Sequence, residues 1–183
     1  MRVLALHKPR GVLCSTVREG GAETVHGLLP SGCRGWFAVG RLDKDSEGLL
    51  LFCDDTRLAQ RLMDPGNLDK TYVVAVAGFP RDEDLAAMRA GGLVIDGKPV
   101  GPVAVRRLGK APRGGTRFEV VLREGRNREI RRLFAAAGFR VRRLVRVAVG
   151  PIRLGELAAG ASRELAAEEV AALVAELPPR APA

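Results

Sequence analysis

The segment Gly40-Arg41-Leu42-Asp43-Lys44-Asp45-Ser46-Glu47-Gly48-Leu49-Leu50-Leu51 joins a charged loop, bounded by glycines, to a wholly apolar run. A short apolar run that follows a glycine predicts a buried strand, and loops carried by buried strands often hold functional side chains. The three carboxylates of this loop are compatible with a metal site, with acid–base chemistry, or with a solvated turn. For a loop taken by itself the solvated turn is the commonest of these.

Further strands are predicted on both sides of this segment, by β-branched and apolar runs between turn residues. They are Val3 to His7, Val12 to Thr16, Leu49 to Cys53, Thr71 to Ala77, Val100 to Leu108, Arg117 to Leu122 and Val141 to Val149. Helices are fewer. Asp54-Asp55 can cap one over Arg57 to Met63, Asp82 another that runs to Ala90, and a third covers Ala166 to Leu177.

Strands with a few interspersed helices, without regular alternation, indicate an α+β fold with a mixed, largely antiparallel central sheet flanked by short helices. We expect one domain over residues 1–177, either single or made of two intimately packed subdomains, and a frayed tail over 178–183. Residues 109–115, which contain Pro112, are expected to form an exposed hairpin loop.

The chain is strongly basic: 183 residues hold 30 Lys and Arg against 21 Asp and Glu, a formal charge of +9. This balance favours a polyanionic partner, of which nucleic acid is the leading candidate, although a genome biased towards arginine would give the same excess. Three widely spaced cysteines and a charged N-terminus without a signal-peptide core predict a reduced, cytoplasmic protein with no membrane segment. His7 and His26 lack ligand or triad spacing, so we expect both to be structural.

Two segments alter the interpretation of the acidic loop. Lys70-Thr71-Tyr72-Val73 begins a strand with the only tyrosine of the chain, which can stack a base or fill the core. In residues 124–138, Ile130, Leu133 and Phe134 form an apolar stripe, with Asn127 as expected N-cap and Gly138 as stop. Arginines in a first helical turn are unfavourable unless an anion lies against them, either an RNA phosphate or a carboxylate. A merely solvated basic face is the alternative.

These segments together resemble the ordered motifs of ribosomal RNA pseudouridine synthases of the small- and large-subunit (RsuA-like) family. The matching stretches are residues 40–51, Lys70-Thr71-Tyr72, residues 124–132 and residues 144–152, with His7-Lys8-Pro9-Arg10-Gly11 and residues 154–157 at the two ends. The resemblance is greatest to the short large-subunit synthase E type. It implies the pseudouridine synthase fold, an isomerase that needs no cofactor and no metal, no N-terminal accessory RNA-binding domain, and a uridine of large-subunit (23S) rRNA as substrate. We expect a monomer.

The resemblance also implies the roles of individual residues. Asp43 is the essential carboxylate, as nucleophile or as base; Arg131 pairs with it; Tyr72 stacks on the flipped uracil. Arg41 and Leu144 belong to the substrate pocket. The candidates for contact with RNA are Lys8, Arg10, Lys70, Arg126, Asn127, Arg128 and Arg132, each of which can equally be a solvated charge.

Three alternatives remain open at this point. A small-subunit rRNA target is one. A non-catalytic RNA-binding ribosome assembly factor is another, but a pure binder has no need of a carboxylate in a cleft for a polyanion. The third is a metal-dependent transferase or hydrolase in which Asp43, Asp45 and Glu47 bind magnesium.

Overall fold

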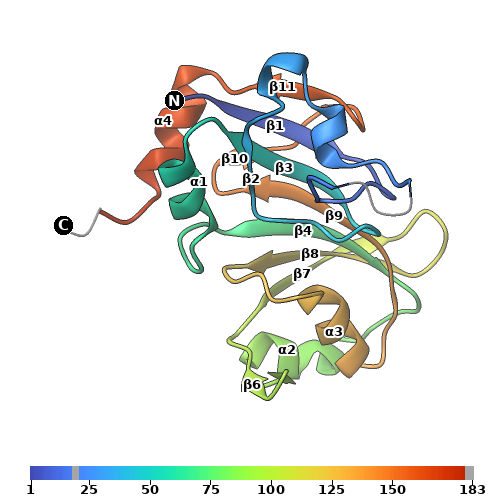
Figure 1. Ribbon diagram of the computed structural model, residues 1–183. Helices are drawn as coiled ribbons and strands as arrows, with labels where there is room; N and C mark the ends of the chain where they lie inside the picture. Colours follow the sequence, from blue (N-terminus) through green and yellow to red (C-terminus); the bar gives the residue numbers. More distant parts are fainter. Residues whose placement is uncertain (18–20, 180–183) are drawn as a thin grey trace. The chain divides into compact units, whose positions relative to one another are not determined.

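The computed structural model describes residues 1–17 and 21–179, and the chain divides into two compact units. Unit 1 comprises Met1–Lys70 and Arg146–Ala183, and unit 2 comprises Thr71–Val145. The boundaries fall at the start of strand β4 (Lys70–Val76) and inside strand β9 (Val141–Val149). Figure 1 shows strands with a few short helices, the expected α+β class, and that expectation is confirmed.

Unit 1 is built on an antiparallel sheet with β1 (Val3–Lys8) between β3 (Glu47–Cys53) and β11 (Ser162–Glu164). The register pairs Lys8 with Gly48 and Leu4 with Glu164. The other elements of unit 1 are η1 (Val25–Leu28), η2 (Ser31–Cys33), β2 (Phe37–Val39), α1 (Thr56–Met63), β10 (Ile152–Arg153) and α4 (Ala167–Ala175). Strand β2 pairs with the second half of β3, so the loop between them returns to the start of β3.

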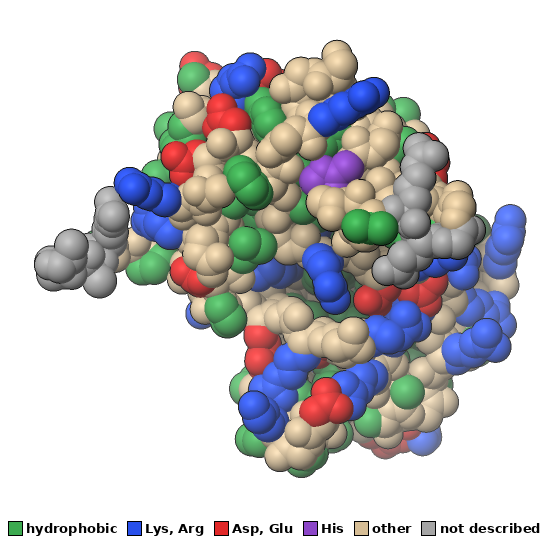
Figure 2. Space-filling view, in the orientation of Figure 1, with side chains coloured by type: hydrophobic (Ala, Val, Ile, Leu, Met, Phe, Trp, Pro, Cys, Tyr) green, Lys and Arg blue, Asp and Glu red, His purple; other side chains and the backbone are tan. Residues whose placement is uncertain are grey.

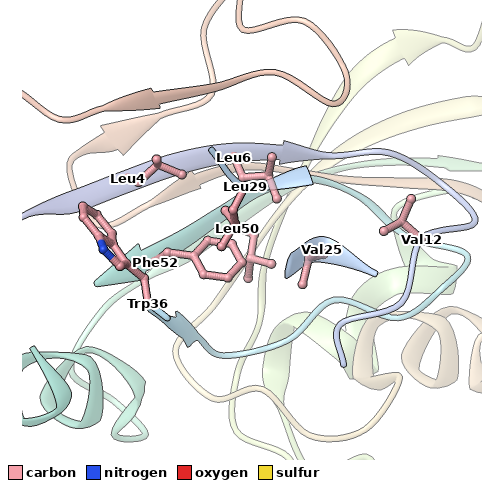
Figure 3. Close-up of a cluster of buried hydrophobic side chains, with 8 residues drawn as sticks. All are labelled: Leu4, Leu6, Val12, Val25, Leu29, Trp36, Leu50 and Phe52. Carbon is pink, nitrogen blue, oxygen red and sulfur yellow. The ribbon is translucent and has the colours of Figure 1, made fainter. Parts of the chain in front are cut away.

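The core of unit 1 lies on one face of β1 and β3 (Figure 3). Its members are Leu4, Leu6, Val12, Val25, Leu29, Trp36, Leu50 and Phe52. Every residue from Leu49 to Cys53 is at most 1% exposed, which explains the continuous apolar run: a strand covered on both faces shows no alternation. The strand that carries the acidic loop is therefore fixed by its burial.

Unit 2 contains β4 from Thr71 onward, β8 (Thr116–Leu122) and β7 (Ala104–Lys110), in the order β4-β8-β7. Its other elements are η3 (Glu83–Leu85), α2 (Ala86–Ala90), β5 (Val94–Ile95), β6 (Lys98–Pro99) and α3 (Glu129–Ala136). Helix α3 packs on the sheet through Phe134, whose ring centroid lies 5.7 Å from that of Phe118. Strands β5 and β6 form a separate small hairpin.

The helix starts follow the sequence signals unevenly. Asp55 caps α1 as expected, accepting a hydrogen bond from Leu58 N at 2.8 Å. Asp82 precedes the expected helix, but its side chain makes no capping bond, and the segment begins as a 3₁₀ turn before α2. An Asp that is drawn to a neighbouring arginine is no longer available to the helix, and Asp82 accepts a hydrogen bond from Arg89.

Two strand predictions were wrong in part. Val12 to Thr16 is not a strand: Leu13 alone forms an isolated bridge with Thr24. The strand expected from Val100 begins at Ala104. Both segments have β propensity, but propensity produces a strand only where a partner edge is available. The loop expected at residues 109–115 does join β7 to β8, but it begins only after Lys110, because Gly109 and Lys110 still pair with β8. Most of the expected tail lies outside the described residues. No helix in the described ranges is long and apolar enough to cross a membrane.

Candidate functional site

The acidic loop of unit 1 is a tight turn that connects β2 to β3. Leu42 is 7% exposed and anchors the loop in the core, whereas Asp43 and Asp45 are half-buried. The carbonyl of Asp43 accepts a hydrogen bond from Ser46 N at 3.0 Å, and Ser46 itself is 1% exposed. The main chain of the loop is therefore folded around Asp43, which is itself half-buried.

Lys8 supports this turn from inside, which corrects the expectation that it contacts RNA. Its side chain is 0% exposed, and its ammonium donates to the carbonyls of Ser46 at 2.7 Å and Pro9 at 3.0 Å. An ammonium that is fully covered and bonded to the main chain is not available to a phosphate. Burial lowers the pKa of Lys8, and the charges of Cys14 and Asp43 act in the opposite direction.

The segment after β1 holds the loop through two further main-chain contacts. Gly11 N donates to the carbonyl of Lys44 at 2.7 Å, and Leu42 N donates to the sulfur of Cys14 at 3.3 Å. Residues on both flanks of Asp43 are thus tied to the N-terminal segment. No sequence motif includes Cys14, because a single thiol without a partner cysteine carries no motif.

Gly48 ends the loop at a position that no other residue could occupy. Its φ is +111°, and a Cβ at this position would lie 2.2 Å from the carbonyl oxygen of Arg146. Arg146 is itself only 3% exposed, and its Nε donates to the carbonyl of Leu49 at 2.7 Å. Its Nη2 is buried without a hydrogen-bond partner among the described residues. The buried positions of β9 alternate through Leu144, Arg146 and Ala148, a signal that could have revealed Arg146 in advance.

The expected aromatic and the basic helix start belong to unit 2. Tyr72 is 8% exposed, so most of its surface is buried. Helix α3 begins one residue later than expected, because Arg128 and not Asn127 is its N-cap, with a left-handed φ of +51°. Arg131 is half-buried and its Nη1 lies 3.4 Å from the carbonyl of Val141.

Two of the arginines expected to contact RNA are joined to the β5–β6 hairpin. Arg132 donates two hydrogen bonds to Asp96, each of 2.6 Å, and this pairing lowers the pKa of Asp96. Arg126 donates to Glu124, and to the carbonyls of Lys98 and Pro99 at 3.2 and 2.8 Å. These contacts brace the start of α3, so both guanidinium groups already have protein partners.

The other predicted residues differ in accessibility. Arg10, Arg41, Asn127 and Arg128 are exposed; Lys70 is half-buried and donates to the carbonyl of Leu68 at 3.2 Å; Leu144 is 5% exposed. Of the expected catalytic set, Asp43 belongs to unit 1, and Tyr72 and Arg131 belong to unit 2.

His7 Nδ1 bonds to the carbonyl of Leu157, and His26 packs edge-on against Phe52. No group of three His, Cys, Asp or Glu suited to a metal ion occurs within residues 1–17 and 21–179.

Comparison with known proteins gives a consistent result. The sequence profile of the RNA pseudouridylate synthase family matches residues 2–136. "Ribosomal large subunit pseudouridine synthase B" of Yersinia pestis is 43% identical over 158 residues, which cover 84% of this chain and 48% of that protein. An uncharacterized RNA pseudouridine synthase of Mycobacterium bovis is 40% identical over 175 residues, covering 93% and 68%. The chain thus spans about half the length of the first of these relatives.

A solved structure agrees with the sequence relatives. A crystal structure described as a pseudouridylate synthase superposes with a TM-score of 0.83 at 30% identity, covering 94% of this chain and 73% of that one. The family expected from the sequence motifs is confirmed. The large-subunit relative named above is a synthase of the B type. The sequence motifs predict the greatest resemblance to the E type.

Proposed function

Because the chain belongs to the RNA pseudouridylate synthase family, we propose that it converts a specific uridine of ribosomal RNA to pseudouridine. Large-subunit rRNA is the proposed substrate, supported by the names of relatives that are 41–43% identical. The chain is proposed to act as a cytoplasmic monomer. Its formal charge of +9 suits a polyanionic substrate.

The observation that carries the proposal is the way in which unit 1 holds Asp43. The main chain of the loop forms hydrogen bonds at Lys44, Ser46 and Leu42. The bond at Ser46 comes from the buried ammonium of Lys8. These bonds hold the main chain of the loop on both sides of Asp43, and Asp43 itself is half-buried. A carboxylate held on a rigid support is what a catalytic residue requires, whereas a merely solvated turn needs no such support.

The reaction is an isomerisation that balances without a co-reactant. The bond between C1′ of the ribose and N1 of the uracil breaks, the base turns, and a new bond joins C1′ to C5. The C5 proton is lost and N1 takes up a proton. In its ionised form Asp43 can attack as a nucleophile or accept a proton from the sugar, and both routes need its negative charge.

The remaining roles follow from the family motifs at matching positions. Arg131 is proposed to pair with Asp43 and to keep it ionised, Tyr72 to stack on the flipped uracil, and Leu144 to line the pocket. Flipping the nucleotide costs a few kcal/mol of stacking, which RNA contacts must offset. Arg10, Arg41 and Arg128, all exposed, are proposed to make such contacts.

The test uses purified protein and large-subunit rRNA transcribed with tritium at C5 of uridine. The wild-type protein should release tritium to water, because C5 exchanges its hydrogen for the glycosidic bond. Asp43→Asn should remove this release, whereas Asp45→Asn, two residues away in the same loop, should retain most of it. Mapping the modified position then identifies the uridine.

Two outcomes would contradict the proposal. Release by Asp43→Asn at the wild-type rate would remove Asp43 from the chemistry. Tight RNA binding by the wild-type protein without release from large- or small-subunit rRNA would favour a binding factor. Retained activity in the presence of a chelator would exclude the magnesium alternative.

A further inference from the structure

Five cationic side chains gather on unit 2 at a place that the catalytic motifs do not include. Three belong to the β7–β8 hairpin and two to the segment that enters β9: Lys110, Arg113, Arg117, Arg140 and Arg142. All five are exposed. Figure 2 shows several blue side chains at the right of the view, where Figure 1 shows the β7–β8 loop. We call these five residues the hairpin basic surface.

The two segments are held together by direct contacts within unit 2. Nη1 of Arg142 donates to the carbonyl of Arg113 at 3.1 Å and lies 3.4 Å from that of Gly114. Both segments also meet the end of β4: Ala77 N donates to the carbonyl of Arg140 at 2.9 Å, and a Cβ on Gly115 would lie 2.1 Å from the carbonyl oxygen of Val76. The surface is thus a fixed arrangement that does not depend on a free loop.

The charge of this surface is not balanced by nearby carboxylates. The three segments that build it, residues 71–80, 107–118 and 130–155, contain no Asp or Glu. None of the five cations makes an ion pair with a carboxylate in the described part of the chain. Arg106 of β7 differs from these five cations, because its guanidinium forms an ion pair with Glu119 at 3.0 Å. Uncompensated like charges repel, and a polyanion relieves that repulsion.

An aromatic ring is exposed beside the hairpin. Phe79 is 69% exposed, more than any other large hydrophobic side chain in residues 1–17 and 21–179. Both of its neighbours are bonded to the hairpin: Thr116 Oγ1 donates to the carbonyl of Gly78 at 3.1 Å, and Arg107 donates to the carbonyl of Pro80. Phe79 is therefore held at the surface by its own backbone and does not fold inward.

From these observations we propose that the hairpin basic surface and Phe79 form a second RNA-docking site, which takes a single-stranded segment of the substrate RNA. The arginines contact phosphates, and the Phe79 ring stacks on an unpaired base. A cationic track with an exposed aromatic ring is the usual arrangement for single-stranded nucleic acid. The proposal rests on the proposed function only for the origin of the RNA.

The experiment measures the binding of a fluorescein-labelled, unstructured oligoribonucleotide of mixed sequence to the full-length protein over a range of salt concentrations. Arg113→Gln and Arg140→Gln should each weaken binding and reduce the slope of log Kd against log salt by about one. Phe79→Ala should weaken binding about 5- to 100-fold with the slope unchanged, and Phe79→Trp should restore the affinity. Neither Arg113 nor Arg140 donates a side-chain hydrogen bond within the described residues, so these variants should fold.

Arg106→Gln is the matched control, since it removes an exposed arginine of β7 that is already paired. It should leave the slope unchanged. If Arg113→Gln and Arg140→Gln bind RNA like this control, the docking site does not exist, whatever the result for Asp43. If the Arg113→Gln and Arg140→Gln variants lose RNA affinity while the wild-type protein releases no tritium, the docking site is supported and the proposed enzymatic activity is contradicted. Loss of retention on polyglutamate with RNA affinity unchanged would point to an acidic protein partner and would overturn the proposal.

Discussion

The Lys8 ammonium and the Ser46 carbonyl, 2.7 Å apart, join the end of β1 to the turn that presents Asp43. Both residues are almost completely buried, and β1 and β3 meet here in the register Lys8 to Gly48. A buried cation usually lies against a carboxylate, but this one is bonded to carbonyl oxygens. It therefore fixes the loop through the main chain.

Lys8→Met should lower the free energy of unfolding by about 2 kcal/mol, because two charge-assisted hydrogen bonds are lost and methionine restores only the packing. Denaturant unfolding followed by circular dichroism measures the change. Lys44→Met, an exposed residue of the same loop, should change stability by less than about 0.5 kcal/mol. Equal stability of the Lys8 variant and wild type would show that the ammonium does not support the loop.

Gly48→Ala should abolish stable folding or lower the free energy of unfolding by about 4 kcal/mol or more. The new methyl group would collide with the Arg146 carbonyl, and the φ of +111° is unfavourable for alanine. Thermal melting is the measurement. Gly35→Ala serves as control, because its φ is not in the left-handed region and no atom lies within 4 Å of the added carbon. A variant that melts like wild type would mean that β3 and β9 can separate at no cost.

Asp96→Asn should loosen the β5–β6 hairpin, since it removes the charge that pairs with Arg132. The amide protons of residues 94–99 should exchange faster with deuterated solvent, while global stability changes little because the pair is exposed. The hairpin should loosen similarly in the wild-type protein when acid protonates Asp96, at a pH below that of an ordinary aspartate, because its pKa is lowered. Glu83→Gln, which lies elsewhere in unit 2, should leave this exchange unchanged.

Glu169 should make the stability of unit 1 depend on acid. Hydrogen bonds from Arg163, and then from Ala166 N, lower its pKa from 4.5 to about 2. A carboxylate whose pKa is lower in the folded state stabilises the fold at pH values above its unfolded-state pKa. This stabilisation is lost as the pH falls from about 5 to 2. Because the Arg163–Glu169 pair is partly exposed, we expect it to contribute about 1 kcal/mol to the free energy of unfolding. Glu169→Gln should thus be less stable than wild type at pH 7 and equal to it near pH 2; a constant difference would refute the linkage. Glu168→Gln should have a smaller effect at both values.

The sequence predicts the elements whose own residues determine them. Strand β9 has the expected bounds, Val141–Val149, because alternation and β-branched residues persist along its length. Helix α1 has its expected cap at Asp55. Val12 to Thr16 has the same propensity and forms no strand, because its outcome depends on which edge is free. The β propensity of a segment depends on its own residues, whereas the strand with which it could pair lies elsewhere in the chain.

The candidate site shows the same division. The motifs predict a catalytic role for Asp43, and the structure places this residue on a turn held by main-chain hydrogen bonds. They do not distinguish a cation that faces solvent from one that faces the core. Lys8, which the motifs place among the RNA contacts, is buried, and so is Arg146, to which the motifs assign no role. Charge type can be read from the sequence, but the direction of a side chain depends on contacts with residues far along the chain.

The discontinuity of unit 1 sets an order of events during synthesis on the ribosome. Unit 2, Thr71–Val145, is one continuous stretch and can collapse as soon as it emerges. Strand β1, which is made first, pairs on one side with β3 but must wait for residues 162–164 to cover its other edge. An uncovered edge strand is a template for association with other chains. The nascent chain therefore presents an uncovered strand edge to other chains from the emergence of β1 until β11 emerges and pairs with it.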